Sequence, residues 1–213
     1  MQGCSTVSHV EVAAVSDALK QIAGKKVYIT HRMRPIYPMR FASYALTVSS
    51  KREANDDPDA LKAMLQAIDD GTPNSVYVMV VENGNHKCRD GRINGHCHGS
   101  QTLFRRSDRR RGRDTAYLQK IGFPVYARGV VPSHIHRPLP VCRRECSRDL
   151  RRRACEPGGI IVADADGVVV VPKAVAPQVL KLAQDMDFKE HSIYAHIEKL
   201  ESIEYAGAKF SRL

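Results

Sequence analysis

The apolar residues of this chain recur with a helical period in some stretches and alternate as in strands in others. In SDALKQIAG, residues 16–24, the apolar side chains share one helical face, with Ser16 or Asp17 as the expected N-terminal cap and Gly24 as the expected end. Apolar and polar residues then alternate over about residues 41–48, which is typical of a strand. The chain is therefore expected to begin with a helix followed by a strand.

A second helix and a second strand follow. DPDALKAMLQAIDDG is amphipathic and predicts a helix that starts at Asp57 or Pro58 and ends at Gly71. SVYVMVVENG, residues 75–84, is typical of a fully buried strand, because its apolar residues run on with little interruption. Helices and strands that alternate in this way are what an α/β domain produces.

The pattern resumes after residue 113 with a short helix and another strand. Asp114 or Thr115 is the expected cap of the helix AYLQKIG, Gly122 is its expected end, and FPVYARGVV is the strand that follows. We expect Tyr117 and Phe123 to lie in the core.

The C-terminal part predicts a hairpin and the closing helices. GGIIVADADGVVVVP holds two β-branched runs joined by Asp-Ala-Asp-Gly, which indicates a hairpin, and Pro172 is expected to end its second strand. AVAPQVLKLAQDM and HSIYAHIEKLESI predict one or two helices. At this length we expect one α/β domain, residues 1–213.

Charge is concentrated in two windows, which changes the meaning of the net charge of +10. Residues 87–112 hold eight basic and two acidic residues, and residues 134–155 hold seven arginines and two acidic residues. The rest of the chain is therefore close to neutral. These two arginine-rich windows also hold five of the six cysteines.

Several interpretations of the windows and of the location follow from composition. Clustered arginines would bind nucleic acid through phosphate contacts, but this interpretation depends wholly on the two windows and we do not expect a nucleic-acid partner. Zinc ligation is disfavoured because the chain has no C-x-x-C pair, and a disulfide framework is disfavoured in a cytosolic chain.

Neither an apolar run of membrane-spanning length nor a secretory signal is found in the sequence, so we expect a cytoplasmic protein without a membrane partner.

Several separated motifs together resemble one known family. They are RDTAYLQKIG, GFPVYARG, PGGIIVADADGVVVVP and KAVAPQVL, with SDAL and MRPIYP nearer the N-terminus. The combination is similar to the family of the regulator of ribonuclease E activity A and the divalent-metal 4-hydroxy-4-methyl-2-oxoglutarate (4-carboxy-4-hydroxy-2-oxoadipate) aldolases. The resemblance covers roughly residues 8–85, 113–133 and 156–185. It implies an α/β fold of one domain, a layered β/β/α sandwich of the swivelling type with a mixed sheet flanked by helices.

Both arginine-rich windows become family-like when their codons are read one base later. In that frame residues 91–112 can encode GASMATATAAKRFSGAVIDGGV, and residues 134–155 can encode TSIGRYRFAGVNVPVICGGVRV. Arginine codons of the CGN type become codons for glycine, alanine, valine or aspartate, which explains the arginine excess. We therefore hypothesise that both windows are out-of-frame translations of an ordinary family member. With their present residues we expect the windows to form loops, because a buried core offers no partners for their arginine charges.

The resemblance implies catalytic roles for Arg113 and Asp114. The arginine would contact the carboxylate of a 2-oxo acid, and the aspartate would hold a divalent metal, Mg or Mn. A hard cation stabilises the enolate formed when a carbon–carbon bond beside a 2-oxo acid breaks, and a planar guanidinium suits a carboxylate. From these two residues alone, the simpler interpretation is that Asp114 caps the following helix and Arg113 is solvated.

A second substrate element is implied 22 positions before that arginine. There the backbone N–H groups of four residues would meet the substrate: Gly91, Arg92, Ile93 and Asn94. Only Gly91 matches the family pattern in the present chain, whereas the shifted frame gives GASM at these positions. Substrate binding is therefore expected to depend on the reading frame.

Two functions follow from the resemblance. The first is a divalent-metal-dependent lyase that cleaves by a retro-aldol reaction, or decarboxylates, small 2-oxo acids such as 4-hydroxy-4-methyl-2-oxoglutarate or oxaloacetate to give pyruvate. The second is a non-catalytic, protein-binding regulator of a ribonuclease. The resemblance also implies a homotrimer or hexamer with sites between subunits.

Overall fold

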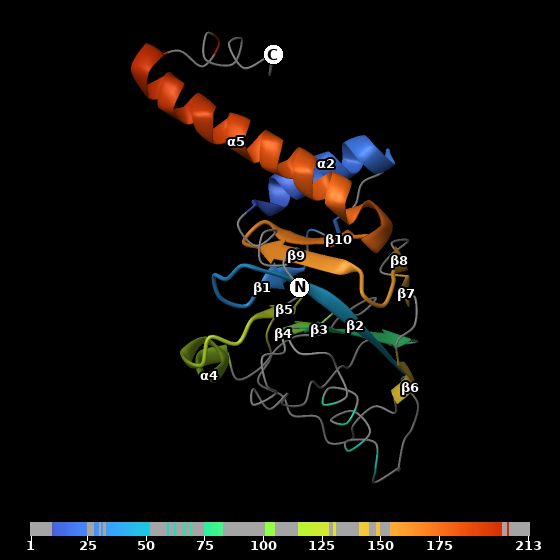
Figure 1. Cartoon of the computed structure of the whole chain (residues 1–213). Helices are drawn as coiled ribbons and strands as arrows, with labels where there is room; N and C mark the ends of the chain where they lie inside the picture. Colours follow the sequence, from blue (N-terminus) through green and yellow to red (C-terminus); the bar gives the residue numbers. More distant parts are fainter. Residues whose placement is uncertain are drawn as a thin grey trace.

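The fold is a stack of helices and sheet layers around one long, bent strand (Figure 1). The computed structural model describes residues 10–24, 28–29, 31, 33–51, 59, 62, 66, 69, 75–82, 101–104, 115–127, 130, 141–144, 148–149, 154–201 and 204. Its helices are α2 (Val12–Ala23), α4 (Thr115–Lys120), the 3-10 turn η1 (Lys173–Val175) and α5 (Ala176–Leu200). None of the helices in these ranges is long and apolar enough to cross a membrane.

One mixed sheet carries most of the strands, in the order β1-β5-β4-β3-β2-β9-β10, with β6 also paired to β2. The bounds are β1 Arg34–Pro35, β2 Phe41–Lys51, β3 Ser75–Glu82, β4 Gln101–Phe104, β5 Val125–Ala127, β6 Val141–Arg144, β9 Ile160–Asp164 and β10 Gly167–Val171. Strands β2 to β5 are parallel, whereas β1, β6, β9 and β10 pair antiparallel. A separate ribbon joins β7 (Arg148–Asp149) to β8 (Ala154–Cys155).

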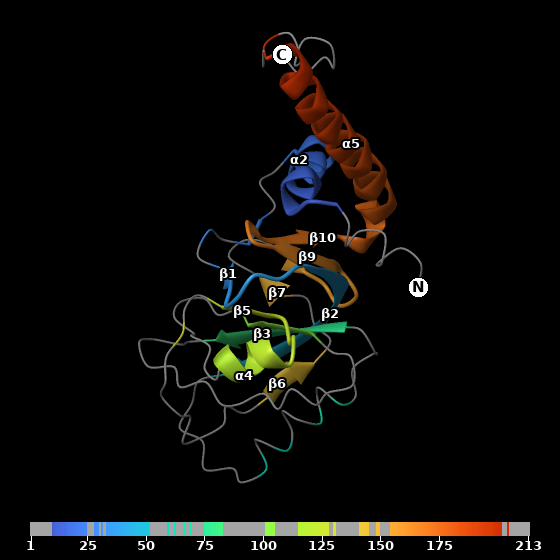
Figure 2. The same cartoon turned by 90° about the vertical axis from the view of Figure 1, so that its left-hand side faces the viewer.

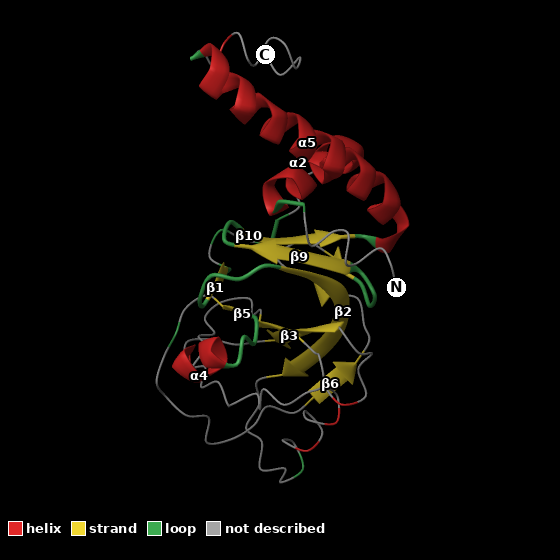
Figure 3. Cartoon of the chain, turned by 60° about the vertical axis from the view of Figure 1, so that its left-hand side comes forward, coloured by secondary structure: helices red, strands yellow, loops and turns green. Residues whose placement is uncertain are grey.

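Strand β2 connects the two sheet layers. Its first residues, from Phe41 to Tyr44, pair with β9, and its remaining residues, from Tyr44 to Lys51, pair with β3. Figure 3 shows β2 curving from the β9–β10 layer toward the layer that contains β3. A strand of 11 residues can take part in both layers because it is long enough to bend between them.

The β9–β10 hairpin is buried on both faces, and each face meets a different core. Ile161 and Val168 face a cluster shared with β2, β3 and β5, whereas Val162 and Val169 face a cluster shared with α2 and α5. Because side chains alternate across a strand, two buried faces require apolar residues at nearly every position. This explains the unbroken apolar runs of the hairpin and confirms the predicted β/β/α layering, with a mixed sheet and helices on its flank.

Most of the predicted elements are confirmed. The hairpin turns where expected, with Gly167 opposite Asp164, and the two C-terminal patterns form one continuous helix, α5. Strands β2 and β3 occupy the predicted stretches, and β5 lies within FPVYARGVV. Lys62, Gln66 and Asp69 are helical, whereas the expected limits of that helix, Asp57 or Pro58 and Gly71, lie outside the described residues.

Helix α4 ends as predicted, but one of its side chains does not lie where expected. Gly122 has a φ of 65°, the N–H of Phe123 donates to the Leu118 carbonyl at 2.9 Å, and that of Gly122 donates to Gln119 at 3.1 Å, which is a Schellman motif. Phe123 is buried, as predicted. The prediction for Tyr117 is wrong, since it is 48% exposed. Leu118, one position further round the helix, takes the inward place.

The predicted cap of the first helix is also wrong. Helix α2 begins at Val12, so Ser16 and Asp17 lie inside it. The Val12 N–H donates instead to Oδ2 of Asp164 at 3.0 Å, and the other oxygen of this carboxylate accepts the Asp166 N–H at 2.9 Å. The acceptor comes from the hairpin, 152 residues away in the sequence, so no local pattern could reveal it.

Replacing Asp164 by alanine is expected to lower the free energy of unfolding by about 1–2 kcal/mol, because it removes an acceptor from the start of α2 and from the hairpin turn. Urea unfolding followed by circular dichroism measures the change. Asp166→Ala is the matched control, since the Asp166 carboxylate has no described hydrogen bond. An equal loss in both variants would contradict the role of Asp164.

The arginine-rich windows are not loops throughout. Strands β4, β6, β7 and β8 all lie within them, so the expectation of loops is wrong at these residues. Strand pairing uses backbone groups, and a few residues of almost any type can satisfy it beside an existing strand. The other window residues lie outside the described part of the chain.

Candidate functional site

The residues predicted to carry the chemistry lie outside the described part of the chain. They are the catalytic pair Arg113 and Asp114 and the backbone element Gly91, Arg92, Ile93 and Asn94. Their roles therefore stay predictions. The described elements that flank them in the sequence are β3, which ends at Glu82, β4, which ends at Phe104, and α4, which begins at Thr115.

Strands β3 and β4 are neighbours and run parallel, with Val76 opposite Gln101 and Met79 opposite Phe104. The chain therefore leaves both strands at the same edge of the sheet. The backbone element follows β3 in the sequence, and the catalytic pair follows β4. In open α/β sheets, ligands bind beyond the carboxyl ends of the strands, so this edge is the natural place for a site.

Helix α4 is held by a small apolar cluster. Leu118, Phe123 and Val125 are buried together, and Ile36 and Tyr37 pack against them. The Tyr37 hydroxyl donates to the Leu118 carbonyl at 3.3 Å, and burial raises the pKa of Tyr37. Figure 2 shows α4 beside the layer that contains β3 and β5. The MRPIYP motif thus supports the helix that directly follows the predicted catalytic pair in the sequence.

The described side chains do not form a metal site by themselves. No three His, Cys, Asp or Glu residues in the described ranges come close enough together to hold a metal ion. Mg²⁺ commonly binds through one or two carboxylates and keeps several waters, so a site based on Asp114 does not require such a group.

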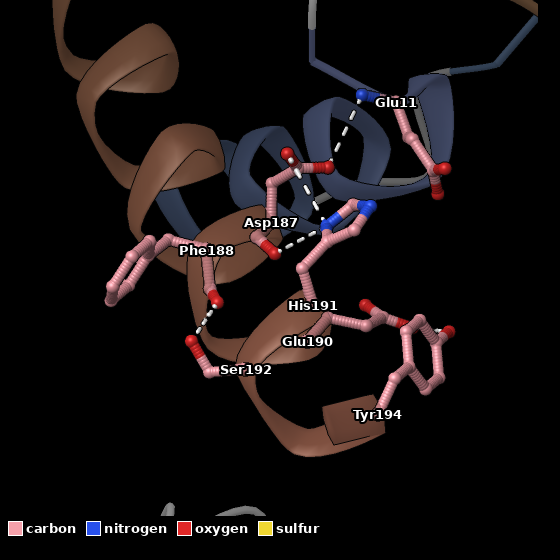
Figure 4. Close-up of polar contacts among 7 residues, drawn as sticks. All are labelled: Glu11, Asp187, Phe188, Glu190, His191, Ser192 and Tyr194. Atoms are coloured by element: carbon pink, nitrogen blue, oxygen red, sulfur yellow. Dashed lines mark hydrogen bonds and ion pairs between the residues drawn. The ribbon is translucent and has the colours of Figure 1, made fainter. Parts of the chain in front are cut away.

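A groove lies on the helical side of the molecule, where the residues just before α2 and the one just before β2 meet α5. It has a volume of about 470 Å³ and is lined by Val10, Glu11, Arg40, Gln184, Asp187, Phe188 and His191. The Asp187 carboxylate accepts the Glu11 N–H at 3.5 Å and lies 3.7 Å from Nδ1 of His191 (Figure 4). These contacts join the start of α2 to the middle of α5. Sequence patterns missed the groove because its residues come from three separate segments.

The environment of His191 predicts a pH effect. Its Nδ1 lies 2.8 Å from the Asp187 carbonyl, and this hydrogen bond is the largest cause that raises the pKa of His191. The negative charge of the Asp187 carboxylate is the second cause, and it acts in the same direction. The resulting stabilisation is present below the ordinary histidine pKa of about 6.5 and is lost as the pH rises through the folded-state pKa. An NMR titration should show a lower His191 pKa in Asp187→Asn, and an unchanged value would contradict this explanation.

A single α/β domain with a mixed sheet, a doubly buried hairpin and a helical cover defines the class of this protein. Its sequence matches the RraA-like family, described as aldolase/RraA, over residues 12–103 and 110–170, so the chain belongs to that family. The match includes residues 87–103 and 110–112 of the first arginine-rich window and all of the second, whereas the motif resemblance covers only the residues around the windows.

Solved structures show the same fold. An uncharacterized protein from Pseudomonas syringae pv. tomato has a TM-score of 0.82 at 23% identity, covering 98% of this chain and 93% of that chain. Streptomyces coelicolor RraAS2, an unusual member of the RNase ES inhibitor RraA protein family, has a TM-score of 0.70 at 20% identity, covering 89% of this chain and 94% of that chain. At these identities the likeness establishes the fold alone.

One curated relative also matches in sequence. An uncharacterized protein of Methanocaldococcus jannaschii is 32% identical over 85 residues, which is 40% of each chain. The present chain thus matches less than half the length of that relative.

Proposed function

We propose that the protein is a divalent-metal-dependent lyase that cleaves or decarboxylates small 2-oxo acids, such as 4-hydroxy-4-methyl-2-oxoglutarate or oxaloacetate, to give pyruvate. Membership of the aldolase/RraA family supports this proposal. The observation that carries it further is the parallel pairing of β3 with β4, because the two predicted substrate segments follow the carboxyl ends of these strands.

Each predicted residue has a distinct task in this proposal. Arg113 would bind the substrate carboxylate through paired hydrogen bonds and fix its orientation. Asp114 would hold Mg or Mn, which supplies positive charge near the keto oxygen when it is bound. Backbone N–H groups in the stretch from Gly91 to Asn94 would position the substrate, which requires small residues where the backbone approaches it closely.

The test uses two proteins. One is the present chain, and the other is the frame-restored chain, in which residues 91–112 and 134–155 carry the shifted-frame sequences. Pyruvate release is followed by coupling to lactate dehydrogenase and NADH, with and without EDTA. We expect EDTA-sensitive activity in the frame-restored chain and little in the present chain. Metal-independent activity would overturn the proposal, and sequencing the gene across codons 85–156 tests the frame hypothesis directly.

The second candidate is a protein-binding regulator of a ribonuclease. It is favoured by the structural likeness to RraAS2, which belongs to an RNase ES inhibitor family. A regulator would compete with RNA for the ribonuclease and would not release pyruvate. For either function we propose a homotrimer or hexamer, which light scattering coupled to size-exclusion chromatography would measure.

A further inference from the structure

Residues 36–39 brace the stretch that contains α4 and β5. The Ile36 N–H donates to the Val125 carbonyl at 3.1 Å, and the Val125 N–H donates to Sδ of Met39 at 3.2 Å. The Tyr126 hydroxyl donates to the Met39 carbonyl at 3.0 Å. Together with the bond from Tyr37 to α4, these contacts fix residues 36–39, the bracing segment, against the helix and the strand.

Helix α4 depends on such support. It has six residues, of which Leu118 is the buried residue. A helix this short is marginal in water without tertiary contacts. Its position must therefore be set by the apolar cluster around Leu118 and by the hydrogen bond from Tyr37.

Tyr37 is well placed to hold the helix. The Leu118 carbonyl, near the C-terminal end of α4, accepts both the Phe123 N–H at 2.9 Å and the Tyr37 hydroxyl at 3.3 Å. Pro35 and Pro38 flank the tyrosine closely, and each restricts the backbone around it. The hydroxyl thus comes from a restrained segment and reaches the helix from outside it.

We propose that Tyr37 is a positioning residue for the metal-dependent site, because it fixes α4 and the first residue of α4, Thr115, directly follows Asp114 in the sequence. This inference rests on the proposed function. Tyr37 would touch neither metal nor substrate. It would act by holding the helix whose first residue directly follows the predicted catalytic pair in the sequence.

The first experiment measures the helix itself in the present chain. Tyr37→Phe removes the hydroxyl and keeps the ring. Because a neutral hydrogen bond changes a local opening equilibrium about fivefold, amide exchange of Phe123 should become about fivefold faster. Tyr44→Phe is the matched control, since Tyr44 is half-buried in the other cluster and its hydroxyl has no described hydrogen bond. Unchanged exchange in Tyr37→Phe would overturn the inference.

The second experiment measures the consequence in the frame-restored chain. Tyr37→Phe should lower kcat and raise the Mg²⁺ concentration needed for half-maximal activity, each on the order of tenfold, because small misplacements of catalytic groups are costly. Its Tm should fall by only about 2–4 °C. An active parent whose kcat and Mg²⁺ dependence do not change in Tyr37→Phe would overturn the positioning role alone. An inactive parent would overturn the proposed function and the catalytic part of this inference with it.

Discussion

Replacing Asp114 by asparagine in the frame-restored chain is expected to reduce kcat for pyruvate release by about 10³-fold, because a bound divalent cation contributes several kcal/mol of charge stabilisation. The variant should also lose most of its Mg²⁺ binding, measured by calorimetry. Asparagine keeps one acceptor oxygen but loses the negative charge that strengthens the binding of a hard cation. Both losses are expected together, because one carboxylate is proposed to cause both.

The same substitution separates the two interpretations of Asp114. Asparagine is as good an N-terminal cap as aspartate, so a residue that only caps α4 would tolerate the change without loss of stability or activity. The matched control is Asp69→Asn, which changes an exposed acid in another helix. Retention of Mg²⁺ binding and of kcat in Asp114→Asn would show that Asp114 is a cap and would remove the metal site from the proposal.

Local patterns were sufficient for elements whose stability is decided by neighbouring residues. Asp164 and Gly167 face each other across the predicted turn, and Gly24 and Gly122 end their helices with φ of 65°. Glycine adopts the left-handed backbone conformation that ends these helices without steric cost. The β-branched runs on either side of the turn favour the hairpin. The layering was implied by the family resemblance and not by a local pattern, although the two buried faces of the hairpin explain why it holds.

Tertiary contacts decided what the patterns could not. The acceptor at the start of α2 is Asp164, which is distant in sequence, so a local pattern favours Ser16 or Asp17 instead. Tyr117 is predicted to lie in the core, yet the packing of α4 turns Leu118 inward instead. Both errors arise because contacts distant in sequence override local preference.

The candidate site depended on a resemblance more than on periodicity. Arg113 and Asp114 are an ordinary pair of charged residues before a helix, and without the neighbouring motifs they would predict a cap. Family membership, now established over residues 12–103 and 110–170, makes the lyase proposal reasonable. The parallel order of β3 and β4 adds a physical reason, because the chain leaves both strands at the same edge of the sheet before it reaches each of the two segments in the sequence.

Restoring the reading frame of both windows is expected to raise the free energy of unfolding by at least about 3 kcal/mol, because burial of an unpaired charge costs that much or more. Strand β6 illustrates the conflict. Its Arg144 pairs opposite Val48, which is fully buried in β2, and the shifted frame places valine at this position. In the first window, β4 forms at Gln101–Phe104, which includes two adjacent apolar residues, Leu103 and Phe104. The shifted frame places a longer apolar run, Ala-Val-Ile, at positions 106–108.

Urea unfolding of the two chains, followed by circular dichroism, measures the difference. Chains with only one window restored should have intermediate stability, since each window supplies its own strands to the fold. If the present chain unfolds at the same urea concentration as the frame-restored chain, its arginines are accommodated without cost. The frame hypothesis would then lose its physical support, because the present chain would be keeping the charged side chains of β6 in water beside the buried Val48 of β2 at no cost.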